Sequence, residues 1–143
     1  MTKKSPSPRR LARRFALQAL YQWKISETPT AQIELEFIAS KSLHKIDVPY
    51  FLDLLHQIPK CVNSLDDLMK PILDRPIDEL NPIELTILRM GIYEILHRPN
   101  VPYRVIIDEA LRLSKTFGTV QGFKYVNAIL DRIAKKIRAT EYL

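Results

Sequence analysis

The sequence predicts an all-α protein, and three observations support that fold class. Apolar residues recur at helical spacing along nearly the whole chain of 143 residues. No stretch alternates cleanly between apolar and polar residues with the period of two that a half-buried strand shows. Only three glycines are present, whereas a β-rich fold of this size normally needs more of them in its turns. We therefore expect helices throughout.

The chain is expected to begin with a flexible basic tail, residues 1–8, because Pro6 and Pro8 prevent an early helix start. The first helix should then run from about Arg9 to Ser26. At about 100° per residue, one side of it forms a core-facing stripe of Ala12, Phe15, Ala16, Ala19, Leu20 and Trp23. The opposite side carries Arg10, Arg13, Arg14, Tyr21 and Lys24, with Leu17 among them.

Two further helices are expected in the first half of the chain. One fits residues 30–43. The next begins at Asp47-Val48-Pro49, which resembles a cap followed by a first helical turn. Pro59 lies inside this second helix and should kink or split it.

The second half opens with the clearest helix signal in the sequence. Asn81 is a good N-cap, Pro82 suits the first helical position, and Glu84 can return a hydrogen bond as in a capping box. We expect this helix to continue to His97. Two more should follow, from about Pro102 to Phe117, where Gly118 is a natural C′ residue, and over about 122–138.

Composition and charge limit the functional classes. The formal net charge is +6, and six of the 22 Lys and Arg residues fall within the first 14 positions, where no acid occurs. Such a charge favours an anionic partner, with nucleic acid favoured over membrane. No apolar run is long enough to span a membrane. Gln18, Gln22 and Lys24 interrupt the stretch that a secretory signal needs, so a mitochondrial transit peptide is the remaining alternative to a cytoplasmic protein.

The sequence contains no recognisable catalytic or metal-binding pattern. His44, His56 and His97 lie far apart and in no metal-ligand spacing. Cys61 is the only cysteine, which excludes an intramolecular disulfide and fits a structural thiol in the cytosol. The paired acids, Asp66-Asp67 and Asp78-Glu79, are expected at solvated helix ends. We therefore expect no catalytic residues, no metal and no cofactor, and hence no enzymatic activity.

The arginine-rich face of the first helix is the strongest functional signal. Several guanidinium groups on one helix side can each contact a phosphate, and each contact releases counterions from the nucleic acid. Tyr21 on the same face offers a platform on which a base can stack. The alternative is a solvated charged face, but no acid precedes Glu27 to pair with these arginines. Charge alone does not distinguish RNA from DNA.

Together with these features, several segments of the chain resemble the NusB family. The segment from Arg9 to Trp23, an arginine-rich start leading into A-x-Q-A-L-Y-x-W, is similar to the opening of that family. The stretches at 68–73, 88–96 with 101–110, and 115–118 with 124–131 resemble later family blocks in the same order. The resemblance implies about seven helices in two packed small bundles, one over about 9–75 and the other over about 76–143, and no catalytic role.

The resemblance also implies partners. NusB-like proteins bind the boxA element of nascent rRNA transcripts as a heterodimer with NusE, a ribosomal small-subunit protein. This pair joins NusA, NusG and RNA polymerase in an antitermination complex. Homodimers occur in some family members and hide the RNA face, so a homodimer in the free state is an open expectation here.

Carried over by position, the resemblance assigns two groups of site residues. The RNA contacts are expected at Arg9, Arg10, Arg13, Arg14 and Tyr21, with Lys124, Tyr125 and Asn127 as additions. Tyr125 has a simple alternative role in packing. The NusE surface is expected on the helix that begins at Asn81, first at Glu84 and then at Arg89, Tyr93 and Glu94, although some of these positions must build the core instead.

Two other functions are compatible with a small helical protein of this kind. Domains similar to NusB precede RNA methyltransferases that act on cytosine in rRNA, but no cofactor-binding αβ region follows up to Leu143, so we expect no such activity from this chain by itself. The second alternative is a helical protein–protein interaction module whose basic tail only aids solubility. Binding to a boxA RNA that weakens with salt would separate this module from an RNA-binding protein.

Overall fold

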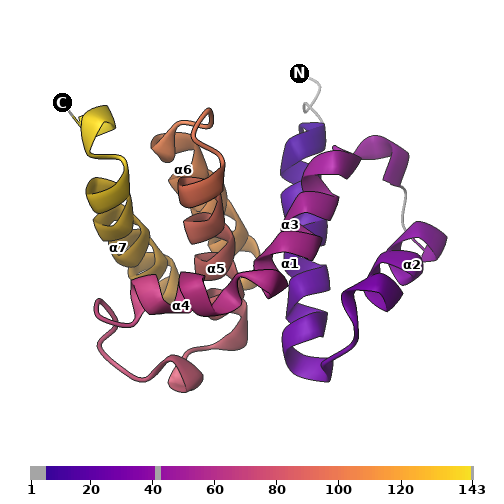
Figure 1. Ribbon diagram of the computed structural model, residues 1–143, viewed down its shortest axis with the longest axis horizontal. Coiled ribbons are helices and arrows are strands. Elements are labelled where there is room, and N and C mark those ends of the chain that lie inside the picture. The colour runs from indigo at the N-terminus through magenta and orange to yellow at the C-terminus, as the bar shows by residue number, and fades with distance from the viewer. Residues whose placement is uncertain (1–5, 41–42, 143) are drawn as a thin grey trace. The chain divides into compact units, whose positions relative to one another are not determined.

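The computed structural model describes residues 6–40 and 43–142, and these residues form seven α-helices, three short 3-10 turns and no strand (Figure 1). This result confirms the predicted all-α class. The predicted tail lies mostly outside the described residues, since the description starts at Pro6. The chain divides into two compact units, Met1–Gln57 and Ile58–Leu143, and each is described by itself.

The first unit contains three α-helices, whose bounds agree closely with the prediction. They are α1 (Pro8–Ser26), α2 (Thr30–Ser40) and α3 (Val48–Lys60), with a 3-10 turn at Leu43–Lys45. The Ser7 hydroxyl caps α1 by accepting a hydrogen bond from the Arg10 amide at 3.2 Å. The regular part of α2 ends at Ser40, three residues earlier than expected, and residues 41 and 42 lie outside the described part.

The core of the first unit is built around three phenylalanine rings. The centroid of Phe15 on α1 lies 6.0 Å from that of Phe37 on α2 and 6.4 Å from that of Phe51 on α3. Alanines at positions 12, 16 and 19 are fully buried on α1, where small side chains allow neighbouring elements to approach. Leu17, which the helical spacing placed among the arginines, is also buried, so an apolar residue interrupts the polar side of α1.

Pro59 splits the third predicted helix, as expected. Helix α3 ends at Lys60, Cys61 forms a turn, and α4 (Val62–Met69) begins directly afterwards. Cys61 is half-buried, in agreement with a structural thiol. Helix α4 contacts α5 and α7, which explains why the division between the units falls near residue 57 and not near residue 75.

The second unit is centred on α5 (Pro82–His97), which contacts α4, α6 (Tyr103–Phe117) and α7 (Val120–Ile137). Every residue of α5 from Glu84 to Ile95 is buried, the pattern of a helix enclosed by its neighbours. A Cβ atom at Gly91 would lie 2.8 Å from Leu130 Cδ1, so this glycine permits the close approach of α5 and α7. Helices α6 and α7 also contact each other, so α5, α6 and α7 pack as a group of three (Figure 1).

The helix ends in the second unit correct three details of the prediction. Helix α7 starts at Val120, two residues early, because the Thr119 hydroxyl caps it by accepting a hydrogen bond from the Gly122 amide at 2.9 Å. Gly118 ends α6 in an extended conformation (φ −104°), without the left-handed geometry usual at C′. Asn81 caps α5 as expected, through its side-chain oxygen and the Ile83 amide at 2.8 Å.

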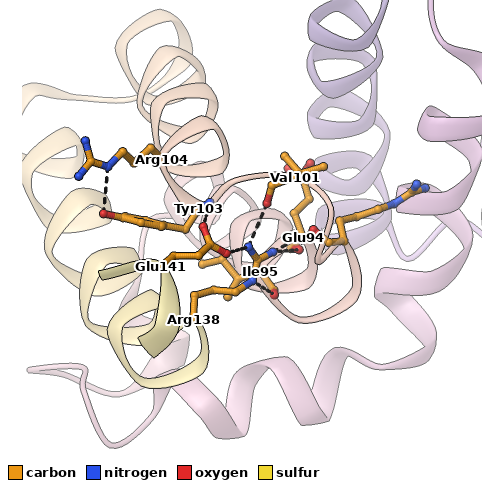
Figure 2. Close-up of polar contacts among 8 residues, drawn as sticks. Glu94, Ile95, Val101, Tyr103, Arg104, Arg138 and Glu141 are labelled. Carbon is orange, nitrogen blue, oxygen red and sulfur yellow. Dashed lines mark hydrogen bonds and ion pairs between the residues drawn. The ribbon is translucent and has the colours of Figure 1, made fainter. Parts of the chain in front are cut away.

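A buried arginine closes the C-terminal end of α5 (Figure 2). Arg138 donates hydrogen bonds to the carbonyl oxygens of Ile95 at 2.9 Å and Val101 at 3.0 Å. It also donates to the Arg98 carbonyl and pairs with Glu141. Glu141 accepts a further hydrogen bond from the Tyr103 amide at the start of α6. The last helical turns of the chain therefore satisfy backbone groups at two other helix ends.

Candidate nucleic-acid interface

The four arginines at the start of α1 form two pairs with different surroundings. Arg9 and Arg13 are four residues apart, as are Arg10 and Arg14, so each pair lies along its own line on the helix surface. At about 100° per residue, the two lines are separated by about a quarter of the helix circumference. The predicted single arginine face is therefore two adjacent faces.

The Arg9–Arg13 pair rests on Tyr50, a buried residue of α3. The guanidinium carbons of Arg9 and Arg13 lie 4.4 and 5.2 Å from the Tyr50 ring centroid, within the range of cation–π contacts. Arg13 Nη2 also donates to the Tyr50 hydroxyl at 3.3 Å. Arg13 is only 4% exposed, whereas Arg9 is exposed. The first line therefore joins α1 to α3, and only its outer member is accessible.

Asp47 fixes the same junction from the other side. One carboxylate oxygen caps α3 by accepting from the Tyr50 amide at 3.2 Å, and the other accepts from Arg9 Nε at 3.4 Å. The Asp47 amide in turn donates to the Pro8 carbonyl at 3.0 Å. The cap was predicted from the sequence, but its second bond, to Arg9, was not. This junction holds the start of α1 in a defined position.

The Arg10–Arg14 line continues along α1 into a polar stripe. Residues at positions 10, 14, 18, 21 and 24 fall on one side of the helix at its spacing of three or four residues. Arg10 and Arg14 are half-buried, Gln18 and Lys24 are exposed, and Tyr21 is 36% exposed. We call these five residues the α1 stripe. Helix α1 contains no acidic residue, so the stripe has no carboxylate neighbour on its own helix.

The remaining RNA-contact candidates lie in the second unit, on the first turns of α7. Lys124 and Asn127 are exposed, while Tyr125 is half-buried. Lys124 and Tyr125 line a cleft of about 530 Å³, whose other walls include Arg75, Gln121 and the start of α5. Cations and amides therefore gather around one open cleft.

An ion pair just before the 3-10 turn Ile77–Glu79 lies against Tyr125. The Tyr125 hydroxyl donates to Asp74 Oδ1 at 3.0 Å, and the Arg75 guanidinium carbon lies 4.9 Å from the ring centroid. Arg75 donates to both oxygens of Asp74, at 2.8 and 3.2 Å. Hydrogen bonding to Arg75, followed by that to Tyr125, lowers the pKa of Asp74. Burial, followed by the Asp74 hydrogen bond, raises the pKa of Tyr125.

Glu84, the first candidate for the NusE surface, is largely buried on the first turn of α5, whereas a surface contact needs an exposed side chain. The residue is 9% exposed, and Oε1 accepts a hydrogen bond from the Thr119 hydroxyl at 3.1 Å in place of the predicted capping-box bond. A Cβ atom at Gly122 would lie 1.8 Å from Oε1, so this glycine leaves the space that the carboxylate fills. Glu84 thus joins the starts of α5 and α7, and it also lines the cleft.

The other three candidates for the partner surface lie in the core of the second unit. Arg89 donates to both oxygens of Asp66, at 2.9 and 2.8 Å, which also corrects the expectation that Asp66 is solvated. Tyr93 and Glu94 are buried as well, and the Tyr93 ring packs against His97 with the centroids 4.8 Å apart. These three side chains are buried because neighbouring helices enclose α5. The cap at Asn81 predicted where α5 begins but not how deeply the helix is buried.

Other functional chemistry is not evident in the described residues. Residues 6–40 and 43–142 contain no group of three His, Cys, Asp or Glu side chains arranged to hold a metal ion. His56 pairs with Glu34 in the first unit. None of the described helices combines the length and apolarity that a membrane span requires.

The comparisons with known proteins agree on one family. The NusB family model matches residues 10–135. The transcription antitermination protein NusB of Legionella pneumophila (strain Corby) is 48% identical over 141 residues, which cover 99% of this chain and 96% of that protein. The protein of the same name from Alcanivorax borkumensis is 47% identical over 137 residues, covering 96% and 91%.

A solved structure supports the same assignment. NusB from T. maritima superposes with a TM-score of 0.81 at 29% sequence identity, and the match covers 98% of this chain and 99% of that one. Sequence similarity over nearly the whole length and a shared fold therefore coincide. The chain belongs to the NusB family of transcription antitermination proteins.

Proposed function

We propose that this protein binds the boxA element of nascent rRNA transcripts together with NusE, and that the pair joins NusA, NusG and RNA polymerase in a cytoplasmic antitermination complex. The NusB family is one of transcription antitermination factors and not of enzymes, which supports this general role. The choice of boxA and NusE comes from the family resemblance. The exposure and charge of individual side chains support the assignment of the contacts to particular residues.

The observation that carries the proposal is the α1 stripe. Arg10, Arg14 and Lys24 supply three cations along one side of a helix that contains no acid. Cations in such a row can follow successive phosphates of a single strand, and Tyr21 between them offers a ring on which a base can stack. Arginine suits this role because its planar guanidinium binds phosphate through two hydrogen bonds.

Arg13 has a different role in this proposal. Its guanidinium is buried against Tyr50, so a phosphate contact would require it to leave that site. We assign Arg13 to positioning, because it holds α1 on α3 and thereby orients the stripe. Arg9 lies above the same ring but is exposed, so it remains an RNA contact together with Arg10, Arg14 and Tyr21.

A second RNA contact is proposed at the start of α7. Lys124 and Asn127 are exposed and supply a cation and an amide that can bind phosphate or base edges. Tyr125 lines the cleft, although the residue is half-buried. We propose that this group contacts the same RNA as the α1 stripe.

The NusE contact is proposed at the start of α5, around Glu84, because this residue lines the open cleft. Arg89, Tyr93 and Glu94 support that helix from within the core. Glu84→Gln keeps the size of the side chain and an acceptor for Thr119, so we expect the fold to survive while NusE binding weakens. Full NusE binding by a folded Glu84→Gln protein would move the interface elsewhere.

The central test is the binding of a fluorescently labelled boxA RNA, followed by anisotropy with and without NusE. Arg10→Ala combined with Arg14→Ala should weaken binding by about tenfold or more, since each charge-assisted hydrogen bond contributes about 1 kcal/mol or more. Lys135→Ala with Lys136→Ala removes the same charge from exposed positions on α7 and should change affinity little. Unchanged affinity in the arginine variant, with NusE still bound, would favour the protein–protein interaction module instead.

A further inference from the structure

Arg75 and Asp74 form a small polar cluster with Tyr125 beside the cleft at the start of α7. Arg75 donates to Asp74 Oδ1 and Oδ2 at 2.8 and 3.2 Å, and Tyr125 donates its hydroxyl proton to Oδ1 at 3.0 Å. The Arg75 guanidinium lies over the Tyr125 ring. One carboxylate thus receives the hydrogen bonds of both an arginine and a tyrosine.

The chemistry of this cluster matches that of a bound phosphate. A carboxylate and a phosphate both accept two parallel hydrogen bonds from a guanidinium, and both accept from a phenolic hydroxyl. Asp74 therefore occupies the groups that a phosphodiester would use. The side chains are accessible, since that of Asp74 is 64% exposed and that of Arg75 is 47% exposed.

The surroundings favour an anion from outside the chain. Arg75, Lys124 and Tyr125 line the same cleft, whose volume of about 530 Å³ lies in the range of sites that hold small molecules. The hydrogen bond to Asp74 and, to a smaller extent, the charge of the buried Glu84 carboxylate at the cleft wall raise the pKa of Arg75, so this guanidinium stays charged. A strand that enters this cleft meets the cations of Arg75 and Lys124 and the Tyr125 ring, against the single, largely buried carboxylate of Glu84 among the described residues that line it.

We propose that Arg75 is a further RNA-binding residue, and that Asp74 is an internal competitor which holds Arg75 and Tyr125 in the free protein until an RNA phosphate displaces it. This inference rests on the RNA-binding function proposed above. An ion pair exposed to this extent is weak, so the competition reduces affinity by a few-fold and does not block binding. The exchange conserves the number of hydrogen bonds to Arg75, because the phosphate takes over those that Asp74 releases.

The test compares the RNA affinity of two variants, each of which replaces one exposed aspartate by asparagine. Asp74→Asn removes the competing charge and should tighten binding of boxA RNA by about three- to fivefold, as expected for the loss of a weak surface ion pair. Asp78→Asn is the matched control, because Asp78 is exposed in the neighbouring 3-10 turn Ile77–Glu79. It removes the same charge, and we expect less than about a twofold change, the level of general electrostatic repulsion.

Repeating the Asp74→Asn substitution in a protein that lacks Arg75 distinguishes direct competition for Arg75 from general electrostatic repulsion of the RNA. Arg75→Gln should weaken RNA binding, and in that background Asp74→Asn should no longer improve it. Equal gains from the two asparagine variants, or a gain that persists without Arg75, would overturn the inference. If RNA binding depends on Arg10 and Arg14 but not on Arg75, the inference alone fails. If no variant shows salt-dependent RNA binding, the proposed function itself fails.

Discussion

The two units differ in how their arginines are used. Those in the core of the second unit are enclosed by protein partners, whereas several in the first unit remain accessible. In the second unit, Arg138 donates hydrogen bonds to backbone carbonyls and pairs with Glu141. Arg89 donates to both carboxylate oxygens of Asp66. In the first unit, Arg10 and Arg14 are only half-buried along α1, so part of each side chain is accessible to solvent. Arg13 lies between these cases, because it belongs to the basic cluster but is buried on Tyr50.

This difference shows that the number of arginines in a motif overstates the number available for a ligand. A guanidinium with buried partners stabilises the fold, since removing it leaves polar groups unsatisfied. A guanidinium whose surface is partly accessible can bind a phosphate at little cost to the fold, and that contact releases counterions from the nucleic acid. Substitutions in the two classes should therefore affect different measurements.

The largest expected effect is on stability, at Arg138. Arg138→Met leaves the carbonyls of Ile95 and Val101 without their donor, and we expect the free energy of unfolding to fall by about 3–5 kcal/mol. Urea unfolding followed by circular dichroism measures this loss. Arg132→Met, at an exposed position on α7, the helix that ends just before Arg138, is the control and should stay within about 0.5 kcal/mol of the wild type. Equal stability of both variants would show that the Arg138 network is unimportant.

The next effect concerns the buried pair of Arg89 and Asp66. Arg89→Met alone leaves the Asp66 carboxylate buried without its partner, so we expect a loss of about 3 kcal/mol. The double variant, Arg89→Met with Asp66→Leu, should recover most of that loss because no charge remains buried. A double variant as unstable as the single one would mean that the packing at this site, and not the unpaired charge, sets the cost.

The smallest effect is a pH dependence at Glu141. The Tyr103 amide, and then Arg138, lower the pKa of this carboxyl below its ordinary value of 4.5. A depressed folded-state pKa stabilises the protein above the unfolded-state value, and that contribution is lost as the pH falls through the folded-state pKa. The stability advantage of the wild type over Glu141→Gln should therefore be present at neutral pH and shrink below about pH 4.5. An advantage that does not vary with pH would contradict this assignment.

Much of the fold was predictable because local signals at the helix ends coincide with the apolar spacing. Asn81-Pro82 marked the start of α5, Pro59 marked the split between α3 and α4, and the order of the helices followed. The division between the units was not predictable in the same way. Helix α4 carries an amphipathic pattern that does not specify its neighbours, so only the structure shows that it packs on α5 and α7.

The candidate site was predictable in residue type but not in exposure. Helical spacing placed Arg13 beside Arg10, because an isolated helix gives no sign that Tyr50, 37 positions later, covers it. Glu84 suited a capping box, yet Thr119 reaches it from 35 positions away. No role was predicted for Asp74 or Arg75, since nothing in their own segment indicates that Tyr125, 51 positions after Asp74, lies against them. In each case a partner distant in sequence decides the role.

The most direct test of the division within the arginine cluster is the salt dependence of RNA affinity in two matched variants, Arg13→Gln and Arg14→Gln. Each removes one positive charge from adjacent positions on α1. If Arg14 contacts a phosphate and Arg13 only positions the helix, the slope of log K against log [salt] should become shallower by about 0.7 for Arg14→Gln and stay unchanged for Arg13→Gln. Arg13→Gln should instead lower the free energy of unfolding. Equal slopes in the two variants, or a shallower slope only for Arg13→Gln, would contradict the account.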